Sequence, residues 1–178
     1  MKKMLLSAAL GIGLMAVPAQ AVGFLFEVDP IDGSVTAPPG ETAGWGYRLG
    51  NTTADWLELT GLSSDVFFGG VPSVLFDFPI LAPGADINVP WSAGATGLFE
   101  FTWDRGVANG TTNSGTFSLD GVFWDGNPLL GGATQVGIAD PQSQNYLVTA
   151  QSVVIPEPAP ILLAIPMALL VIARKLYA

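Results

Sequence analysis

The middle of the chain alternates apolar and polar side chains at every second residue, between closely spaced turns. Twenty of the twenty-two glycines lie between Val22 and Ile155, which excludes long helices there. Such alternation, with aromatic side chains on one face, is typical of a half-buried β-strand. The segments with this pattern are 24–28, 45–49, 57–60, 74–80, 87–91, 99–103, 116–119 with 122–124, and 146–153. We therefore expect an all-β domain, an antiparallel sandwich of about 8–9 short strands.

Two segments of the middle lack this alternation. Residues 106–115 are polar and glycine-rich, and we expect a mobile hairpin loop there. Residues 128–144 are expected to be a long irregular segment.

The first twenty-one residues have the three parts of a secretory signal peptide. Lys2 and Lys3 give a positive start, residues 4–17 are uncharged and mostly apolar, and Ala19-Gln20-Ala21 has the A-x-A form of a cleavage site. We expect a signal helix at 1–21, recognised by the Sec translocon and cleaved by signal peptidase at the site that Ala19 and Ala21 mark. The exported domain is then expected to span 22–153.

The exported part is strongly acidic. Between Val22 and Ile155 two arginines stand against fourteen acidic residues, a net charge of −12. This charge repels phosphates, so we expect no nucleic-acid partner. The chain has no cysteine, so no disulfide supports the fold.

The end of the chain combines a stiff tripeptide with a short apolar run. Pro156-Glu157-Pro158 precedes fifteen uncharged residues, 159–173, and Arg174 and Lys175 follow. A spanning helix needs about twenty residues, so this run is a marginal span that suits a transient anchor in the inner membrane. The basic pair is expected to stay on the cytoplasmic side as a stop.

This arrangement resembles the PEP-CTERM sorting signal, which the sequence carries at 154–178. Members of that family are substrates of exosortases, membrane proteases or transpeptidases of Gram-negative bacteria, often encoded beside exopolysaccharide genes. The resemblance implies that Pro156, Glu157 and Pro158 are the sorting motif, that the apolar run forms a short transmembrane helix, and that Arg174 and Lys175 are its basic end. The family's tails are often Gly- and Leu-rich, whereas this run has no glycine and contains Pro166.

A stretch of the middle is similar to other exported PEP-CTERM proteins. It reads "PPGETAGWGYRLGNTTADWLEL", with Pro-Gly, then Gly-Trp-Gly-Tyr, then a Trp-Leu strand. The likeness implies an immunoglobulin-like form of the sandwich and nothing catalytic.

The residues of the middle argue against an enzyme. Val22 to Ile155 contains no His, Cys or Lys, which removes the usual general base, thiol nucleophile and Schiff-base amine. Carboxylate pairs such as Glu100 with Asp104, or Asp120 with Asp125, leave a glycoside hydrolase as the last-ranked alternative. We expect no cofactor. Carboxylates in turns, at Asp29, Asp32, Asp120 and Asp125 with Asn127, suit calcium chemically but match no calcium-loop spacing, so no metal site is predicted.

The five tryptophans invite a glycan-binding interpretation, since sugar rings stack on aromatic faces. Trp45, Trp91 and Trp103 share apolar strand faces and are expected in the core. Trp56 falls on the opposite strand face from Leu57, and Trp124 adjoins a turn. These two are therefore the candidate glycan contacts.

Together these patterns predict a non-enzymatic exported protein. An exosortase would process it, leaving it at the cell surface or in the extracellular matrix of a Gram-negative bacterium, associated with exopolysaccharide or biofilm. The alternative from a different class is a carbohydrate-binding adhesin or lectin with a defined glycan site.

Overall fold

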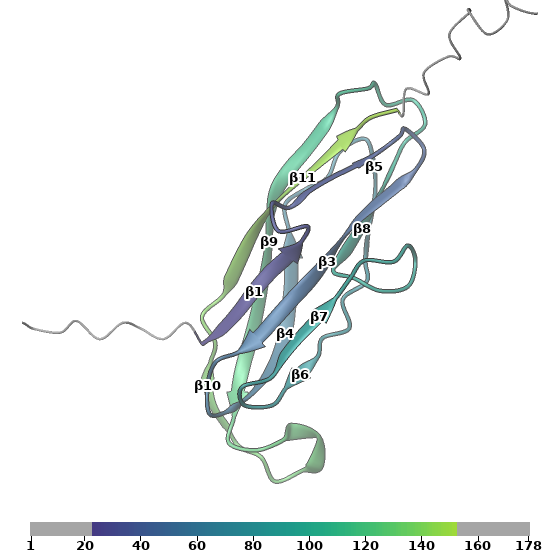
Figure 1. The fold of residues 1–178 in the computed structure, drawn as a ribbon. Coiled ribbons are helices and arrows are strands. Elements are labelled where there is room, and N and C mark those ends of the chain that lie inside the picture. Colours follow the sequence, from purple (N-terminus) through teal and green to yellow (C-terminus); the bar gives the residue numbers. More distant parts are fainter. Residues whose placement is uncertain (1–22, 153–178) are drawn as a thin grey trace, which may run out of the picture.

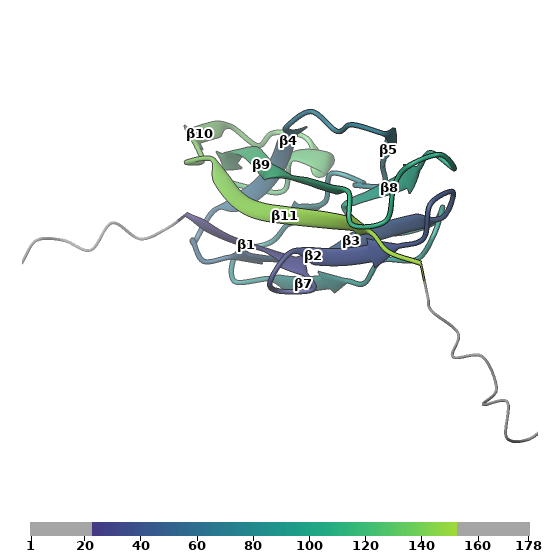
Figure 2. The ribbon, with the colours of Figure 1, turned by 90° about the horizontal axis from the view of Figure 1, so that it is seen from above.

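The computed structural model describes residues 23–152, which form eleven β-strands and one short 3-10 helix. The strands build two sheets packed face to face, an elongated sandwich (Figures 1 and 2). The first sheet contains β1 (Phe24–Asp29), β3 (Thr42–Asn51), β5 (Gly70–Val74), β7 (Asp86–Val89) and β8 (Phe99–Trp103). The second contains β2 (Ser34–Ala37), β4 (Trp56–Ser64), β6 (Ile80–Leu81), β9 (Thr112–Trp124), β10 (Gln135–Ile138) and β11 (Gln142–Ala150). The predicted all-β sandwich is therefore confirmed.

Two finer parts of the prediction are wrong. The sandwich has eleven strands in the described residues rather than eight or nine, because β2, β5, β6 and β10 are short or lack alternation. The second sheet is mixed, since β2 pairs with β11 in parallel while the other pairs are antiparallel. The helices expected at 1–21 and within 154–178 lie outside the described residues. Within 23–152 no helix is long and apolar enough to cross a membrane.

β3 is the central strand of the five-stranded sheet. One edge pairs with β1, and the other pairs first with β8 and then with β7. Trp45, Tyr47 and Leu49 of β3 are at most 1% exposed, as their alternation predicts. Together with Phe24, Phe26, Phe101 and Trp103 of the neighbouring strands, they supply the five-stranded sheet's side of the core.

The core is built mainly from aromatic rings. Trp45 meets Phe117 and Tyr146 edge-on, with ring centroids 5.2 and 5.5 Å apart, and Phe67 stacks between Phe101 and Tyr146. Trp45 Nε1 donates a hydrogen bond of 2.7 Å to the Gly33 carbonyl. Rings from both sheets thus interlock in the middle of the sandwich, and the polar atom of the central indole has a partner.

Segment 74–80 was predicted as a strand and is not one. β5 ends at Val74 and β6 begins at Ile80, and the residues between them form no strand. Phe76 is still buried, against the ring of Tyr47, while Phe78 has a positive φ of 52°. The alternating apolar residues here belong to a connecting segment that buries the ring of Phe76 in the core.

The two segments predicted as loops are also more ordered than expected. β9 starts at Thr112, inside the predicted loop 106–115, and runs without interruption through 116–124. Segment 128–144 contains the 3-10 helix η1 (Pro128–Leu130), all of β10 and the start of β11.

Candidate functional site

The structure brings the two candidate glycan contacts together. β4 begins at Trp56 and β9 ends at Trp124. The two residues are direct partners in the antiparallel register, although 68 positions separate them in the sequence. Residues directly opposite in an antiparallel pair point to the same face. Leu57 and Leu59 point into the core, 0% and 2% exposed, so both tryptophans lie on the outer face of the six-stranded sheet.

Glu58 shares the pair's end of the sheet and orients one of the indoles. Trp124 Nε1 donates a hydrogen bond of 2.8 Å to Glu58 Oε2, a diagonal contact between β9 and β4. The indole N–H is therefore satisfied by a neighbouring side chain, and both indoles are half-buried rather than enclosed. We call Trp56, Trp124 and Glu58 the tryptophan platform.

The rest of this outer face is a mixture of apolar, acidic and hydroxyl side chains, with exposed Asp120 between Val122 and Ser118 on β9. Next to the platform, Val122 of β9 pairs with Glu58 on one side and with Ile138 of β10 on the other, and Ile138 is 80% exposed. Further along β9 the face becomes polar, with Ser118 and Ser143 joined through their hydroxyls at 2.7 Å. An extended polyhydroxylated ligand would meet aromatic rings first and hydroxyl groups beyond them.

The platform lies at the end of the sandwich away from the C-terminal exit. β4 begins and β9 ends beside β10, whereas β11 leaves the sandwich at the opposite end of the long axis (Figure 1). Figure 2 shows the same separation from above. Ser152, the last described residue, is held there by hydrogen bonds from its backbone N and its hydroxyl to Asn109 Oδ1.

Trp91 was predicted as a core residue, and this is wrong. β7 ends at Val89, since Pro90 has no N–H to continue the ladder, and the chain turns so that Trp91 lies over β3. A Cβ on Gly44 would overlap the Trp91 indole, so glycine on the outward side of β3 makes room for the ring. Trp45 and Trp103 are core residues as predicted, 0% and 1% exposed.

Trp91 forms part of the wall of a cavity that the sequence did not indicate. The cavity has a volume of about 390 Å³ and lies where β1 ends, beside β2 and the start of β3. Its wall includes Asp29, Thr36, Thr42 and Pro90. We call it the Trp91 cavity. No sequence signal marks it, because its wall comes from four separate segments.

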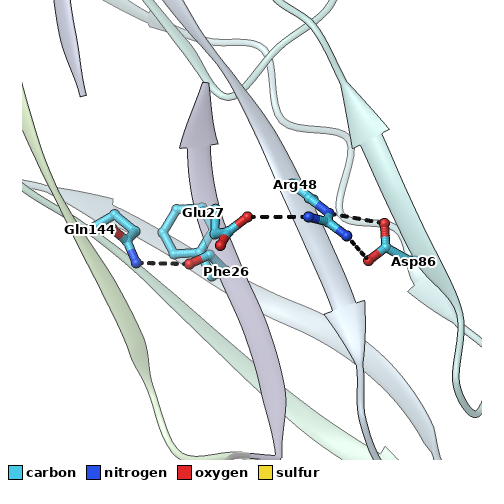
Figure 3. A network of polar contacts seen from close by, with 5 residues as sticks. All are labelled: Phe26, Glu27, Arg48, Asp86 and Gln144. Carbon is cyan, nitrogen blue, oxygen red and sulfur yellow. Dashed lines mark hydrogen bonds and ion pairs between the residues drawn. The ribbon is translucent and has the colours of Figure 1, made fainter. Parts of the chain in front are cut away.

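A charged row crosses the outer face of the five-stranded sheet. Arg48 of β3 lies between Glu27 of β1 and Asp86 of β7 (Figure 3), with Arg48 Nη2 2.9 Å from Asp86 Oδ2 and Nη1 3.7 Å from Glu27 Oε2. The hydrogen bond to Asp86 raises the pKa of Arg48. On the other side of β1, Gln144 Nε2 donates to the Phe26 carbonyl at 2.8 Å and links β11 to the first sheet. These contacts join strands, and the Arg48 guanidinium in this row is already paired with carboxylates.

Two of the turn carboxylates, Asp32 and Asp125, and the neighbouring Asn127 have local structural partners. Asp32 Oδ1 accepts from Ser34 N, Asp125 Oδ1 accepts from Thr134 N, and Asn127 Oδ1 caps η1 through Leu129 N. Within residues 23–152 no three His, Cys, Asp or Glu side chains gather to hold a metal ion.

Each candidate carboxylate pair consists of one strand residue and one residue just past the end of that strand. Glu100 lies on β8, which ends one residue before Asp104, and Asp120 lies on β9, which ends one residue before Asp125. At about 3.3 Å per extended residue, the Cα atoms are at most about 13 Å apart in the first pair and at most about 16 Å apart in the second.

The sorting motif Pro156, Glu157 and Pro158, the basic pair Arg174 and Lys175, and the cleavage residues Ala19 and Ala21 lie outside the described residues.

Comparison with known proteins gives a fold likeness of low similarity. No protein-family model matches the chain, and no curated protein matches it. Among solved structures, the chain is similar to the ASH/PapD-like domain of human CEP192 (PapD-like domain 7). The TM-score is 0.40 at 12% identity, over 84% of this chain and 98% of that one.

Proposed function

We propose that this protein is an exported, non-enzymatic component of a bacterial surface or extracellular polysaccharide matrix, and that the tryptophan platform is its glycan contact. The observation that carries the proposal is the direct cross-strand pairing of Trp56 with Trp124 on an outer sheet face. Two half-buried indoles in register offer adjacent apolar ring faces, and Glu58 adds an acceptor for sugar hydroxyls.

The net charge favours a neutral glycan. The chain has a formal net charge of −9, and the platform itself contains a carboxylate, so an acidic polysaccharide or a phosphate would be repelled. The platform also lies away from the exit of the C-terminal segment, which leaves it open to the surroundings in a chain tethered by its tail.

The test is binding of the full chain, in mild detergent, to immobilised neutral polysaccharides. Trp56→Ala and Trp124→Ala should each weaken retention at least tenfold, because each removes one ring face. Phe68→Ala is the matched control, since that aromatic is 71% exposed and lies in the connection from β4 to β5, outside the platform. Equal retention of all four proteins would contradict the assignment of the platform.

Sorting by an exosortase is the second part of the proposal, supported by the sequence at 154–178. Under it the signal peptide and then the Pro156-Glu157-Pro158 tail are processed, after a transient stay in the inner membrane. The immunoglobulin-like type of the sandwich belongs to the same proposal. The intact mass of the mature protein from its native cells tests it: a chain that still contains residues 159–178 would contradict processing.

A further inference from the structure

The Trp91 cavity is separate from the tryptophan platform. Trp45 points from β3 into the core, so the outward side of its neighbour Gly44, where Trp91 packs, is the outer face of the five-stranded sheet. The platform lies on the outer face of the six-stranded sheet. The wall of the cavity also contains Thr36 of β2, a strand of the six-stranded sheet, so the cavity lies at the edge between the two sheets and shares no residue with the platform.

The cavity combines an aromatic wall with uncommitted polar groups. The indole of Trp91 packs against Gly44, and Pro90, which precedes Trp91 in the chain, is also part of the wall. Asp29 and Thr36 are exposed at the wall, and within residues 23–152 neither the Asp29 carboxylate nor the Thr36 hydroxyl has a hydrogen-bond partner. Thr42 is already bonded to Thr102, hydroxyl to hydroxyl at 2.8 Å.

The size and charge of the cavity limit its ligand. A volume of about 390 Å³ is within the range of small-molecule sites, ~300–1,000 Å³. The wall contains a carboxylate and no basic side chain, which disfavours anions. An apolar ring face beside a carboxylate acceptor and a hydroxyl matches a neutral sugar unit, which has a C–H face and a rim of hydroxyl donors.

We propose that the Trp91 cavity is a second glycan subsite, which takes one neutral sugar unit, and that the protein thereby bridges two polysaccharide chains. This inference rests on the proposed glycan-binding function. Two separate sites that share no wall residue can each hold a sugar unit of a different chain, so their combined effect is cross-linking and higher avidity in a polysaccharide network.

The stoichiometry of binding tests the second site. Isothermal titration of the full chain, in mild detergent, with a short neutral oligosaccharide of the polysaccharide retained in the platform assay should give two sites per chain. The double variant Asp29→Asn with Thr36→Ala should give one, because both free polar groups of the cavity are changed without removing a buried side chain. The variant Trp56→Ala should also give one, with the cavity site retained.

Bridging is the second readout. Beads coated with the same polysaccharide should aggregate with the wild-type chain, and the cavity double variant should reduce aggregation at least tenfold while still coating the beads. If the double variant keeps two sites and full aggregation, the cavity proposal is overturned and the platform stands. If no neutral glycan binds any form of the chain, the proposed function itself fails.

Discussion

Trp45 lies between the two sheets and Trp56 lies on the outer face of one of them, and the two indoles have different surroundings. The ring of Trp45 has aromatic neighbours from both sheets, and its N–H is bonded to a backbone carbonyl. The ring of Trp56 is half-buried, with Trp124 as its register partner on the next strand. The interior indole is enclosed and stabilises the fold, whereas part of each indole of the surface pair stays accessible.

The largest expected effect is on the interior side of this comparison. Trp45→Ala should lower the free energy of unfolding by about 3–5 kcal/mol, because it leaves a cavity among Phe67, Phe117 and Tyr146. Denaturant unfolding followed by circular dichroism measures it. Trp56→Ala is the comparison variant and should cost about 1 kcal/mol or less. The distinction between the regions breaks down if Trp56→Ala destabilises the protein as much as Trp45→Ala.

A smaller effect is expected where a ring lies outside the core but against a strand. Gly44→Ala should cost about 1–3 kcal/mol, because the new methyl group overlaps the Trp91 indole and the ring must move. Gly106→Ala is the matched control, since a Cβ there meets nothing within 4 Å. Melting temperatures of the two variants give the comparison, and equal values would show that Trp91 is not held against β3.

Tyr47 makes the stability of the interior depend on pH. Burial, followed by the hydrogen bond to Asp77 and the charge of Asp77, raises the pKa of Tyr47, whose hydroxyl donates to Asp77 Oδ1 at 2.8 Å. The folded state thus prefers the protonated phenol. Its stabilisation is complete below the unfolded pKa of about 10 and is lost as the pH rises above that value.

Tyr47→Phe should cost about 1 kcal/mol at pH 7 and flatten the decline in stability above pH 10. Unfolding free energies at pH 7, 9 and 10.5 check this. Tyr146 also has a raised pKa, through burial and then the charge of Asp65, so part of the alkaline decline should remain in the variant. A variant with the wild-type alkaline slope would contradict the assignment to Tyr47.

The smallest effect is expected when a surface indole is replaced by another aromatic ring. Trp124→Phe removes the N–H that donates to Glu58 and should cost about 0.5 kcal/mol, because Glu58 regains water. Glycan binding should fall less than in Trp124→Ala, since an aromatic face remains. Parallel melting and binding curves of the two variants separate ring stacking from the hydrogen bond, and equal loss of binding would assign the contact to the N–H.

The sequence pattern predicts the interior better than the surface. Alternation at Trp45, Tyr47 and Leu49 correctly identifies a strand with one buried face, since the period of two is a local property of the backbone. The same rule misplaces Trp91, because Pro90 ends the ladder and turns the chain. It also misplaces 74–80, where Phe76 is buried from a segment that forms no strand.

The proposed sites depend on contacts that local pattern does not encode. Alternation favours an outward Trp56, but its pairing with Trp124 requires the register of β4 on β9, including the shift between Leu59 and Gly61. The Trp91 cavity requires β1, β2, β3 and the turn after β7 to meet in one place. Both are properties of the assembled sandwich.

The parallel pairing of β2 with β11 has a consequence for how the chain reaches its final form. Leu147 to Ala150 lie beside Ser34 to Ala37. β2, an edge strand near the start of the sandwich, therefore pairs with β11, the last strand. Contacts of such long sequence separation close late and slowly in folding. A chain threaded through a translocation pore from its N-terminus would then finish its second sheet only after residue 150 has emerged, so transport and folding would be separated in time.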